Sequence, residues 1–180
     1  NMYGAIGIHP EDVDDATQED IKFIEDNLSN EKIVAIGEIG LDYYYTKDNK
    51  EEQIKLFETQ LALAEKYNLP VIVHSRDATE DTINSLKKFN CKGVIHSFSG
   101  SLETARIYIK MGYLLGVNGV ITFKNAKIKE VIKEVGLENI ILETDSPYLT
   151  PEPFRGKQNN PGHVFEVAKF VADLYNISFH

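Results

Sequence analysis

The chain has 180 residues, of which 42% are hydrophobic and 26% are charged, a balance typical of a soluble globular protein. This composition excludes a disordered chain and a fibrous repeat, and the single cysteine, Cys91, excludes a disulfide scaffold. The acidic balance, with a net charge of −9, gives no support to nucleic-acid binding by charge alone. It does not exclude a phosphate-handling enzyme, because bound divalent cations supply positive charge locally.

Two features that the sequence lacks indicate where in the cell the protein is expected. No apolar run approaches the roughly 20 residues of a membrane helix, so no membrane partner is predicted. The lack of paired cysteines is typical of a reducing compartment, and we predict a cytoplasmic protein. No feature of the sequence predicts an obligate protein partner.

Strand-like and helix-like segments alternate along the chain. The first apolar run, 3–8, precedes a helix that Thr17 is predicted to cap, with Asp20 three residues inside it. The other predicted strands are 33–36, 70–73, 93–95, 113–117 and 140–142. The other predicted helices are 50–68, 79–89, 103–111, 125–135 and 161–175, with Gly112 and Gly136 as stops.

The pattern of these segments indicates the fold class. The strands are continuous apolar runs and do not alternate, which is typical of parallel strands covered by helices. Six β–α units in succession favour an α/β barrel or a doubly wound sheet. No second domain is visible, so we predict a single domain over residues 1–180.

Nearly every predicted strand ends in a residue that can bind a metal ion or a phosphate. These residues are His9, Glu38, His74, His96 and the pair Glu143 and Asp145. In α/β barrels the active site lies at the carboxyl ends of the strands, so these side chains are expected around one rim. A single histidine after a strand is more often structural than a ligand, but five polar strand ends in six units strongly favour a metal site.

Histidines and carboxylates together suit divalent ions such as Mg²⁺, Mn²⁺ or Zn²⁺. A carboxylate such as Glu38 can bridge two ions, and paired ions about 3.5–4 Å apart suit phosphoester cleavage. Glu143 and Asp145 would share one side of an extended strand. Periodicity alone leaves open which of the two is a ligand. Cys91 has no partner in the pattern and is interpreted as core filler.

Several residues near these strand ends could hold substrate. Arg76 suits bidentate phosphate contact, although an ion pair with Asp77 is the alternative. The run 43–45 (YYY) could stack on bases, but packing of a loop is slightly favoured. Arg155, with Lys157 and His163, belongs to a Pro/Gly/Asn-rich loop that is either a substrate loop or an ordinary solvated connection.

Five ordered strings resemble the TatD family of metal-dependent deoxyribonucleases, a branch of the metallo-dependent hydrolases. They are residues 7–10 (GIHP), 37–42 (GEIGLD), 73–78 (VHSRDA), 96–100 (HSFSG) and 143–149 (ETDSPYL). The resemblance extends over essentially the whole chain. It implies a TIM-type (β/α)8 barrel, of which about six β/α units are present, with two divalent metal ions. It also implies hydrolysis of phosphodiester bonds in DNA, single-stranded or at 3′ ends, commonly as a 3′–5′ exonuclease.

The resemblance also implies roles for individual residues. Glu38 corresponds to the carboxylate that bridges two ions, and His74 and His96 correspond to ligands of one of them. Asp145 corresponds to a ligand of the other ion and a candidate base for the attacking water. His9 corresponds to an active-site residue that contacts the scissile phosphate.

The sequence departs from the family pattern at two places. The family's first strand carries a His-x-His pair that is absent here, and an entire barrel needs about 250 residues. We therefore expect about two units ahead of Asn1 and a short segment after His180 to be missing, and the isolated chain to be a poor catalyst. The family's Asn-Glu-Pro string is replaced by residues 159–161 (NNP), which removes one carboxylate.

Two other functions remain open at the level of sequence. Related barrels with similar metal ligands hydrolyse other esters or amides, and deacylation of D-aminoacyl-tRNA is attributed to members of the family. The other alternative is a non-catalytic binding or scaffold protein, which the missing His-x-His pair would favour.

Overall fold

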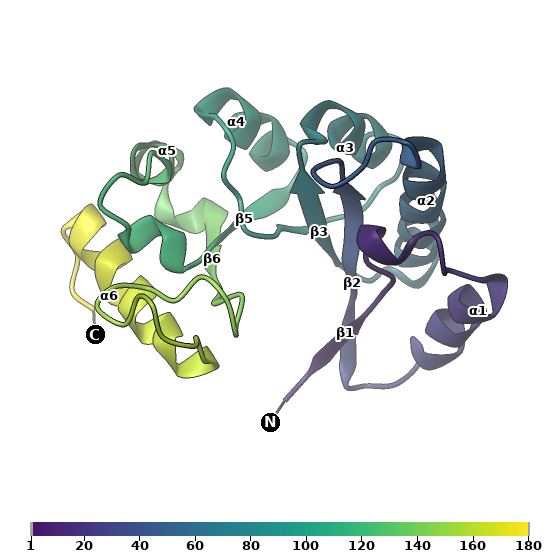
Figure 1. The fold of residues 1–180 in the computed structure, drawn as a ribbon, viewed down its shortest axis with the longest axis horizontal. Coiled ribbons are helices and arrows are strands. Elements are labelled where there is room, and N and C mark those ends of the chain that lie inside the picture. Colours follow the sequence, from purple (N-terminus) through teal and green to yellow (C-terminus); the bar gives the residue numbers. More distant parts are fainter. Residues whose placement is uncertain (1, 180) are drawn as a thin grey trace. The chain divides into compact units, whose positions relative to one another are not determined.

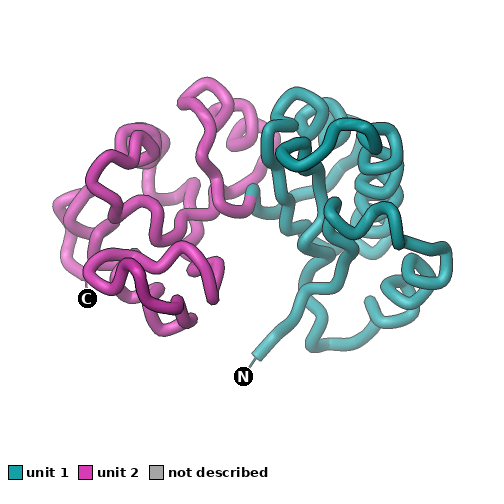
Figure 2. Tube along the Cα trace, in the orientation of Figure 1, with its two compact units in different colours: residues 1–95 teal, residues 96–180 magenta. Residues whose placement is uncertain are grey.

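A computed structural model describes residues 2–179 of the chain. The chain divides into two compact units, Asn1–Ile95 and His96–His180 (Figure 2). Each unit alternates parallel strands with helices (Figure 1). The prediction of a single domain over 1–180 stays a prediction.

The first unit contains four parallel strands in the order β1-β2-β3-β4. Helices α2 and α3 pack against β2 and β3 (Figure 1). A short 3-10 helix, η1 (Pro10–Asp12), follows the first strand. The strands are β1 (Gly4–Ile6), β2 (Ile33–Asp42), β3 (Val71–Arg76) and β4 (Gly93–Ile95), and the helices are α1 (Gln18–Asn27), α2 (Lys50–Tyr67) and α3 (Thr79–Leu86).

Helix α1 begins as the sequence predicts. The Thr17 hydroxyl accepts a hydrogen bond from the Asp20 backbone N–H at 3.2 Å, and the Asp20 carboxylate accepts one from the Thr17 N–H at 2.9 Å. This reciprocal capping box satisfies two N–H groups that the first helical turn leaves without an intrahelical partner. The core of this unit includes seven side chains with no exposed area: Ile36, Ile39, Leu41, Phe57, Leu61, Val71 and Val73.

The second unit contains one parallel strand pair, β5 (Tyr113–Val117) with β6 (Ile140–Leu142). Its helices are α4 (Leu102–Lys110), α5 (Ile128–Val135) and α6 (Val164–Tyr175), with the 3-10 helices η2 (Gly119–Thr122), η3 (Leu137–Asn139) and η4 (Pro161–His163) between them. Its hydrophobic core joins β5, η2, α5 and α6 through Val117, Ile121, Ile132, Val167 and Val171.

The predicted strands at 93–95, 113–117 and 140–142 are confirmed at both ends. Strand β2 is six residues longer than predicted, because it pairs with β3 as far as Asp42 opposite Arg76. Helix α3 ends three residues early at Leu86, α5 begins three residues late at Ile128, and the segment 161–175 starts as a 3-10 turn before α6. Gly112 and Gly136 follow helix ends with φ of 89° and 90°, as predicted.

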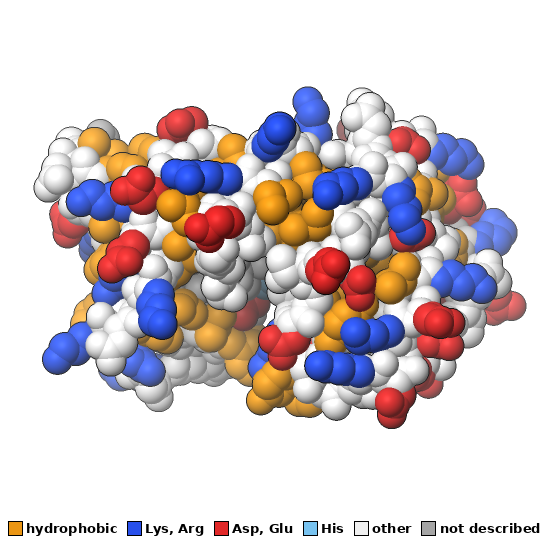
Figure 3. Space-filling view, turned by 90° about the horizontal axis from the view of Figure 1, so that it is seen from above, with side chains coloured by type: hydrophobic (Ala, Val, Ile, Leu, Met, Phe, Trp, Pro, Cys, Tyr) orange, Lys and Arg blue, Asp and Glu red, His pale blue; other side chains and the backbone are white. Residues whose placement is uncertain are grey.

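The surface carries both signs of charge. On the face drawn in Figure 3, acidic and basic side chains are interspersed with apolar areas. Within residues 2–179, no helix is both long and apolar enough to cross a membrane.

Cys91 provides a test of the packing in the first unit. Its side chain is buried, with Sγ 3.5 Å from the Leu61 carbonyl oxygen, and burial followed by the charge of Glu65 raises the thiol pKa from 9.0 to about 11. We therefore expect slow alkylation of the native protein by iodoacetamide at pH 8, and rapid alkylation in urea.

The sign of the pH dependence follows from the same shift. The unfolded thiol ionises at a lower pH than the folded one, so its ionisation weakens folding between about pH 9 and 11. Replacing Cys91 with Ser removes the thiol that titrates there and should flatten this part of the stability profile. Fast alkylation of the native protein at pH 8 would contradict the buried placement.

Candidate metal centre

Three candidate ligands come together in the first unit. His9 follows β1, Glu38 lies in β2 and His74 lies in β3. His74 Nδ1 is 2.9 Å from Glu38 Oε1, and His9 Nε2 is 3.8 Å from the same oxygen. One possible ligand atom from each of these three residues lies within 4.8 Å of the other two. The structure therefore brings three of the predicted strand-end residues together in this unit, and their role as a metal site stays a prediction.

Asp42 is a fourth member of this cluster that the sequence analysis did not single out. Its carboxylate is 2.8 Å from His74 Nε2, and the residue is only 3% exposed. The side chain of Gln53 on α2 fixes this end of β2, since it accepts from the Asp42 N–H and donates to the Asp42 carbonyl. The signal was present in the string 37–42, in which Asp42 follows Glu38 by four residues along one strand.

The close approach of β2 and β3 depends on Gly40. Its φ of 144° is accessible to glycine and rarely adopted by other residues, and a Cβ placed there would lie 1.9 Å from the His74 carbonyl oxygen. Any side chain at this position would separate the strands at the point where Glu38 and His74 meet.

The two histidines of this unit have different electrostatic surroundings. Burial by itself lowers the pKa of His74, but its hydrogen bonds to Glu38 and Asp42 outweigh burial and raise that pKa above the ordinary value. For His9, burial and then the charge of His74 dominate, and the pKa is lowered. His9 Nδ1 accepts from the Glu11 N–H at 3.3 Å, so a neutral His9 carries its proton on Nε2.

The second unit surrounds His96 in a similar way. His96 Nδ1 is 2.8 Å from Glu143 Oε2, and Nε2 is 3.2 Å from Asp145 Oδ1. The expectation that Glu143 and Asp145 share one side of an extended strand is wrong, because β6 ends at Leu142 and Asp145 has φ of 56°. The turn brings both carboxylates to the same ring, one at each nitrogen.

Glu143 and Asp145 differ in what holds them. Glu143 Oε1 also accepts from the Ser97 N–H at 2.6 Å, and its carboxylate packs over Gly116, where a Cβ would lie 2.7 Å from Oε2. Glu143 is thus fixed against the backbone behind His96. The turn that carries Asp145 is held by Asn159, whose amide donates to the carbonyls of Thr144 and Tyr148 at 2.8 and 2.6 Å.

The predicted substrate residues have varied surroundings. Among residues 2–179, no carboxylate lies within 4.0 Å of the Arg76 guanidinium, so the alternative of an ion pair with Asp77 is wrong. Arg76 instead lies over the Tyr44 ring, with Cζ 3.6 Å from its centroid. In the run 43–45, packing of the loop applies to Tyr43, which is 3% exposed, while Tyr44 and Tyr45 are 56% and 71% exposed. Stacking on bases stays a prediction.

The loop after Asp145 has internal contacts. Arg155 Cζ lies 4.1 Å from the Phe123 ring centroid. The His163 ring stacks on Phe154 at 4.6 Å, and its Nδ1 and Nε2 are hydrogen-bonded to Asn159 and Asn160. Substrate contact by Arg155 and His163 stays a prediction, as does the convergence of Glu38, His74, His96 and Asp145 on one rim.

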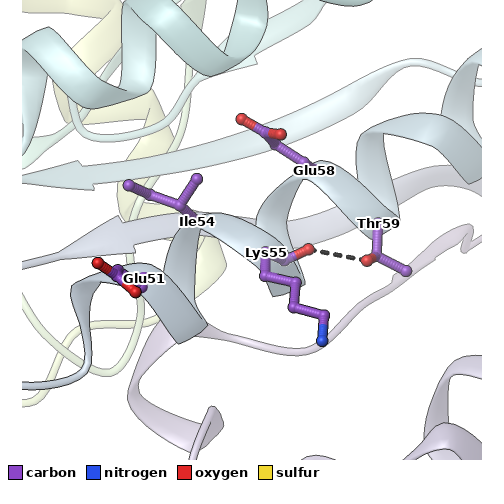
Figure 4. A pocket seen from close by; sticks show the side chains of 5 residues that line it. All are labelled: Glu51, Ile54, Lys55, Glu58 and Thr59. Carbon is purple, nitrogen blue, oxygen red and sulfur yellow. Dashed lines mark hydrogen bonds between the residues drawn. The ribbon is translucent and has the colours of Figure 1, made fainter.

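A surface hollow elsewhere in the first unit does not belong to this cluster. It is lined by Glu51, Ile54, Lys55, Glu58 and Thr59, all on α2, where the Thr59 hydroxyl donates to the Lys55 carbonyl at 2.8 Å (Figure 4). None of the candidate ligands lines it.

Comparison with known proteins identifies the family. The family described as "TatD related DNase" matches residues 1–180. The chain belongs to this family. It is 48% identical to the uncharacterized metal-dependent hydrolase YabD of Bacillus subtilis, and the alignment covers 99% of this chain and 71% of that protein. It is 37% identical to the uncharacterized metal-dependent hydrolase YcfH of Escherichia coli K12, with coverages of 99% and 68%.

A solved structure supports the fold of this TatD-family chain. The crystal structure of the TatD homologue YjjV from Escherichia coli K12 matches with a TM-score of 0.87 and 35% identity, covering 96% of this chain and 68% of that one. The match confirms the predicted fold class, a TIM-type α/β barrel of which about six β/α units are present. The protein is a metal-dependent hydrolase of the TatD type.

The donor types of both clusters suit a divalent cation, and in the first unit three ligand atoms lie close enough together to hold one. In each unit two carboxylates flank one imidazole, with one carboxylate at each ring nitrogen. Imidazole nitrogen and carboxylate oxygen together form a donor set that binds Zn²⁺, Mn²⁺ and similar ions. In the first unit Glu38 and His74, with His9 beside them, could hold the ion. In the second unit His96 and Asp145 could do so.

We expect Asp42→Asn to weaken Mn²⁺ binding by about 10–100-fold, as measured by calorimetry. The carboxylate that holds Nε2 of His74 makes the ring a more basic ligand, and loss of such a partner has effects of this size. Asp81→Asn is a matched control, because Asp81 accepts a hydrogen bond from the Tyr43 hydroxyl in the same unit. Equal affinities for Asp42→Asn and the wild type would contradict the role assigned to Asp42.

Proposed function

We propose that this TatD-family hydrolase cleaves phosphodiester bonds in DNA, acting with two divalent ions as a 3′–5′ exonuclease. The observation that carries the proposal is the pair of histidines, each flanked by two carboxylates: His74 by Glu38 and Asp42, and His96 by Glu143 and Asp145. Family membership supports the same activity.

The contacts of the two rings support a ligand set. His74 places Nε2 against Asp42 and Nδ1 toward Glu38, and His96 places Nδ1 against Glu143 and Nε2 toward Asp145. A neutral ring that carries its proton on the nitrogen facing Asp42 or Glu143 leaves its other nitrogen to a metal ion. Glu38, His74, His96 and Asp145 would therefore hold the ions. When bound, divalent cations supply Lewis-acid stabilisation of the negative charge that develops on the phosphate.

Other steps belong to the side chains of the chain itself. Asp145 is the candidate base that takes a proton from the attacking water. His9 is fixed by the Glu11 N–H so that its Nε2–H points into the cluster, and this proton suits a hydrogen bond to a phosphate oxygen. Because His9 has its proton on the nitrogen that faces Glu38, we assign it to substrate and not to the metal.

The proposal predicts metal-dependent release of nucleotides from single-stranded DNA. With a 5′-labelled oligonucleotide in Mg²⁺ or Mn²⁺, the complete protein should give a ladder that shortens from the 3′ end, and EDTA should abolish it. Glu38→Gln should lower the rate by about 100-fold or more, because it removes the charge of a carboxylate that would hold the ions.

A matched control is Glu58→Gln, which alters a carboxylate of α2 that accepts hydrogen bonds from the exposed Lys88 and the buried Ser85. Its rate should equal that of the wild type. Metal binding without release of nucleotides from DNA would contradict the nuclease and direct the search to another ester or amide substrate.

A further inference from the structure

We infer that Tyr44, Tyr45 and Arg76 form a stacking platform that binds the bases of single-stranded DNA beside the candidate metal centre. The inference deepens the proposed function and rests on it. It concerns how the substrate is held, whereas the metal ligands concern how it is cleaved.

The three side chains form one cluster on the surface of the first unit. The rings of Tyr44 and Tyr45 meet edge to face, with centroids 4.9 Å apart and an interplanar angle of 86°. The Arg76 guanidinium lies 3.6 Å from the centroid of Tyr44 and 5.6 Å from that of Tyr45. Both rings remain more than half exposed, so the contacts among the three side chains leave most of the aromatic area in water.

This cluster lies next to the candidate metal centre, because the Asp42 carboxylate and strand β3 connect the two. Asp42 accepts from His74 through Oδ2 and from the Tyr44 N–H through Oδ1, at 2.8 and 2.9 Å. Arg76 lies two residues beyond His74 on β3, and alternate residues of a strand face the same side. DNA bound with a phosphate at His74 would therefore lie beside Arg76, which is two residues further along β3, and so beside the platform.

The charge of the chain explains why such a platform would be needed. A net charge of −9 gives no long-range attraction for a polyanion, so the affinity must come from local contacts. Within the described residues no carboxylate pairs with Arg76, which keeps its positive charge available to a phosphate. Exposed aromatic rings beside a cation are the combination that binds single strands with little sequence preference.

The test measures binding separately from cleavage. The complete protein carries Glu38→Gln as a common background in Mg²⁺, and binding of a fluorescein-labelled oligothymidylate of about 12 nucleotides is followed by anisotropy. Tyr44→Ala and Tyr45→Ala should each weaken binding about ten-fold, the size of one lost base-stacking contact. Arg76→Lys should also weaken it, because lysine keeps the charge but loses the planar group that stacks.

Two controls separate stacking from other effects. Tyr3→Ala removes another exposed tyrosine that lies beneath a cation, since Lys32 Nζ is 4.8 Å from the centroid of its ring. Tyr3 precedes β1 and therefore lies at the end of the strands opposite to the candidate metal centre. Its binding should not change. An oligomer with the same phosphates but abasic sugars should bind the wild type and the Tyr44 and Tyr45 variants equally.

Each result decides the matter. An equal loss on the abasic oligomer, or no loss on the oligothymidylate, would overturn the platform, as would a failure of the background protein to bind the oligothymidylate. If the complete protein cuts DNA while the tyrosine variants bind normally, the platform fails and the nuclease stands. If the variants lose base-dependent binding but the wild-type protein does not cut DNA, the platform stands and the nuclease fails.

Discussion

The contact between β2 and β3 at Gly40 is the constraint on which the first half of the candidate site depends. Only a residue without a side chain lets β2 lie so close to the His74 carbonyl, and that approach places Glu38 and Asp42 on either side of the His74 ring. Gln53 of α2 then holds the end of β2 through its backbone at Asp42. The packing of one helix on one strand pair thus sets the orientation of an imidazole.

The second unit reaches a comparable arrangement by another route. Here a glycine of β5, Gly116, leaves room for the Glu143 carboxylate, which binds both the His96 ring and the Ser97 backbone. The other carboxylate comes from a turn in which Asp145 adopts a left-handed conformation, held by the buried amide of Asn159. In both units a glycine makes space for the contact, and a buried polar side chain fixes the backbone around it.

The sequence predicted the fold class, and it singled out three residues that the structure brings together in the first unit, because the ends of strands can be recognised in it. Short apolar runs mark the strands, and the residue that follows each run marks the rim, as for His74 and His96. Asp42 was missed because β2 continues past its apolar run, and only pairing with β3 reveals that length. The roles of Glu143 and Asp145 stayed open because they depend on a backbone turn, and strand periodicity cannot anticipate a positive φ at Asp145.

The charge of the two clusters connects stability with function. Each places two carboxylates around one imidazole, so even a protonated ring leaves an excess of negative charge in a half-buried site. The hydrogen bonds of these carboxylates outweigh burial and raise the pKa of His74 above its ordinary value. A divalent cation would offset this excess of negative charge, and binding to the folded state alone would stabilise that state by mass action. The carboxylates that prepare the site for a metal are therefore the groups whose mutual repulsion a bound metal would relieve.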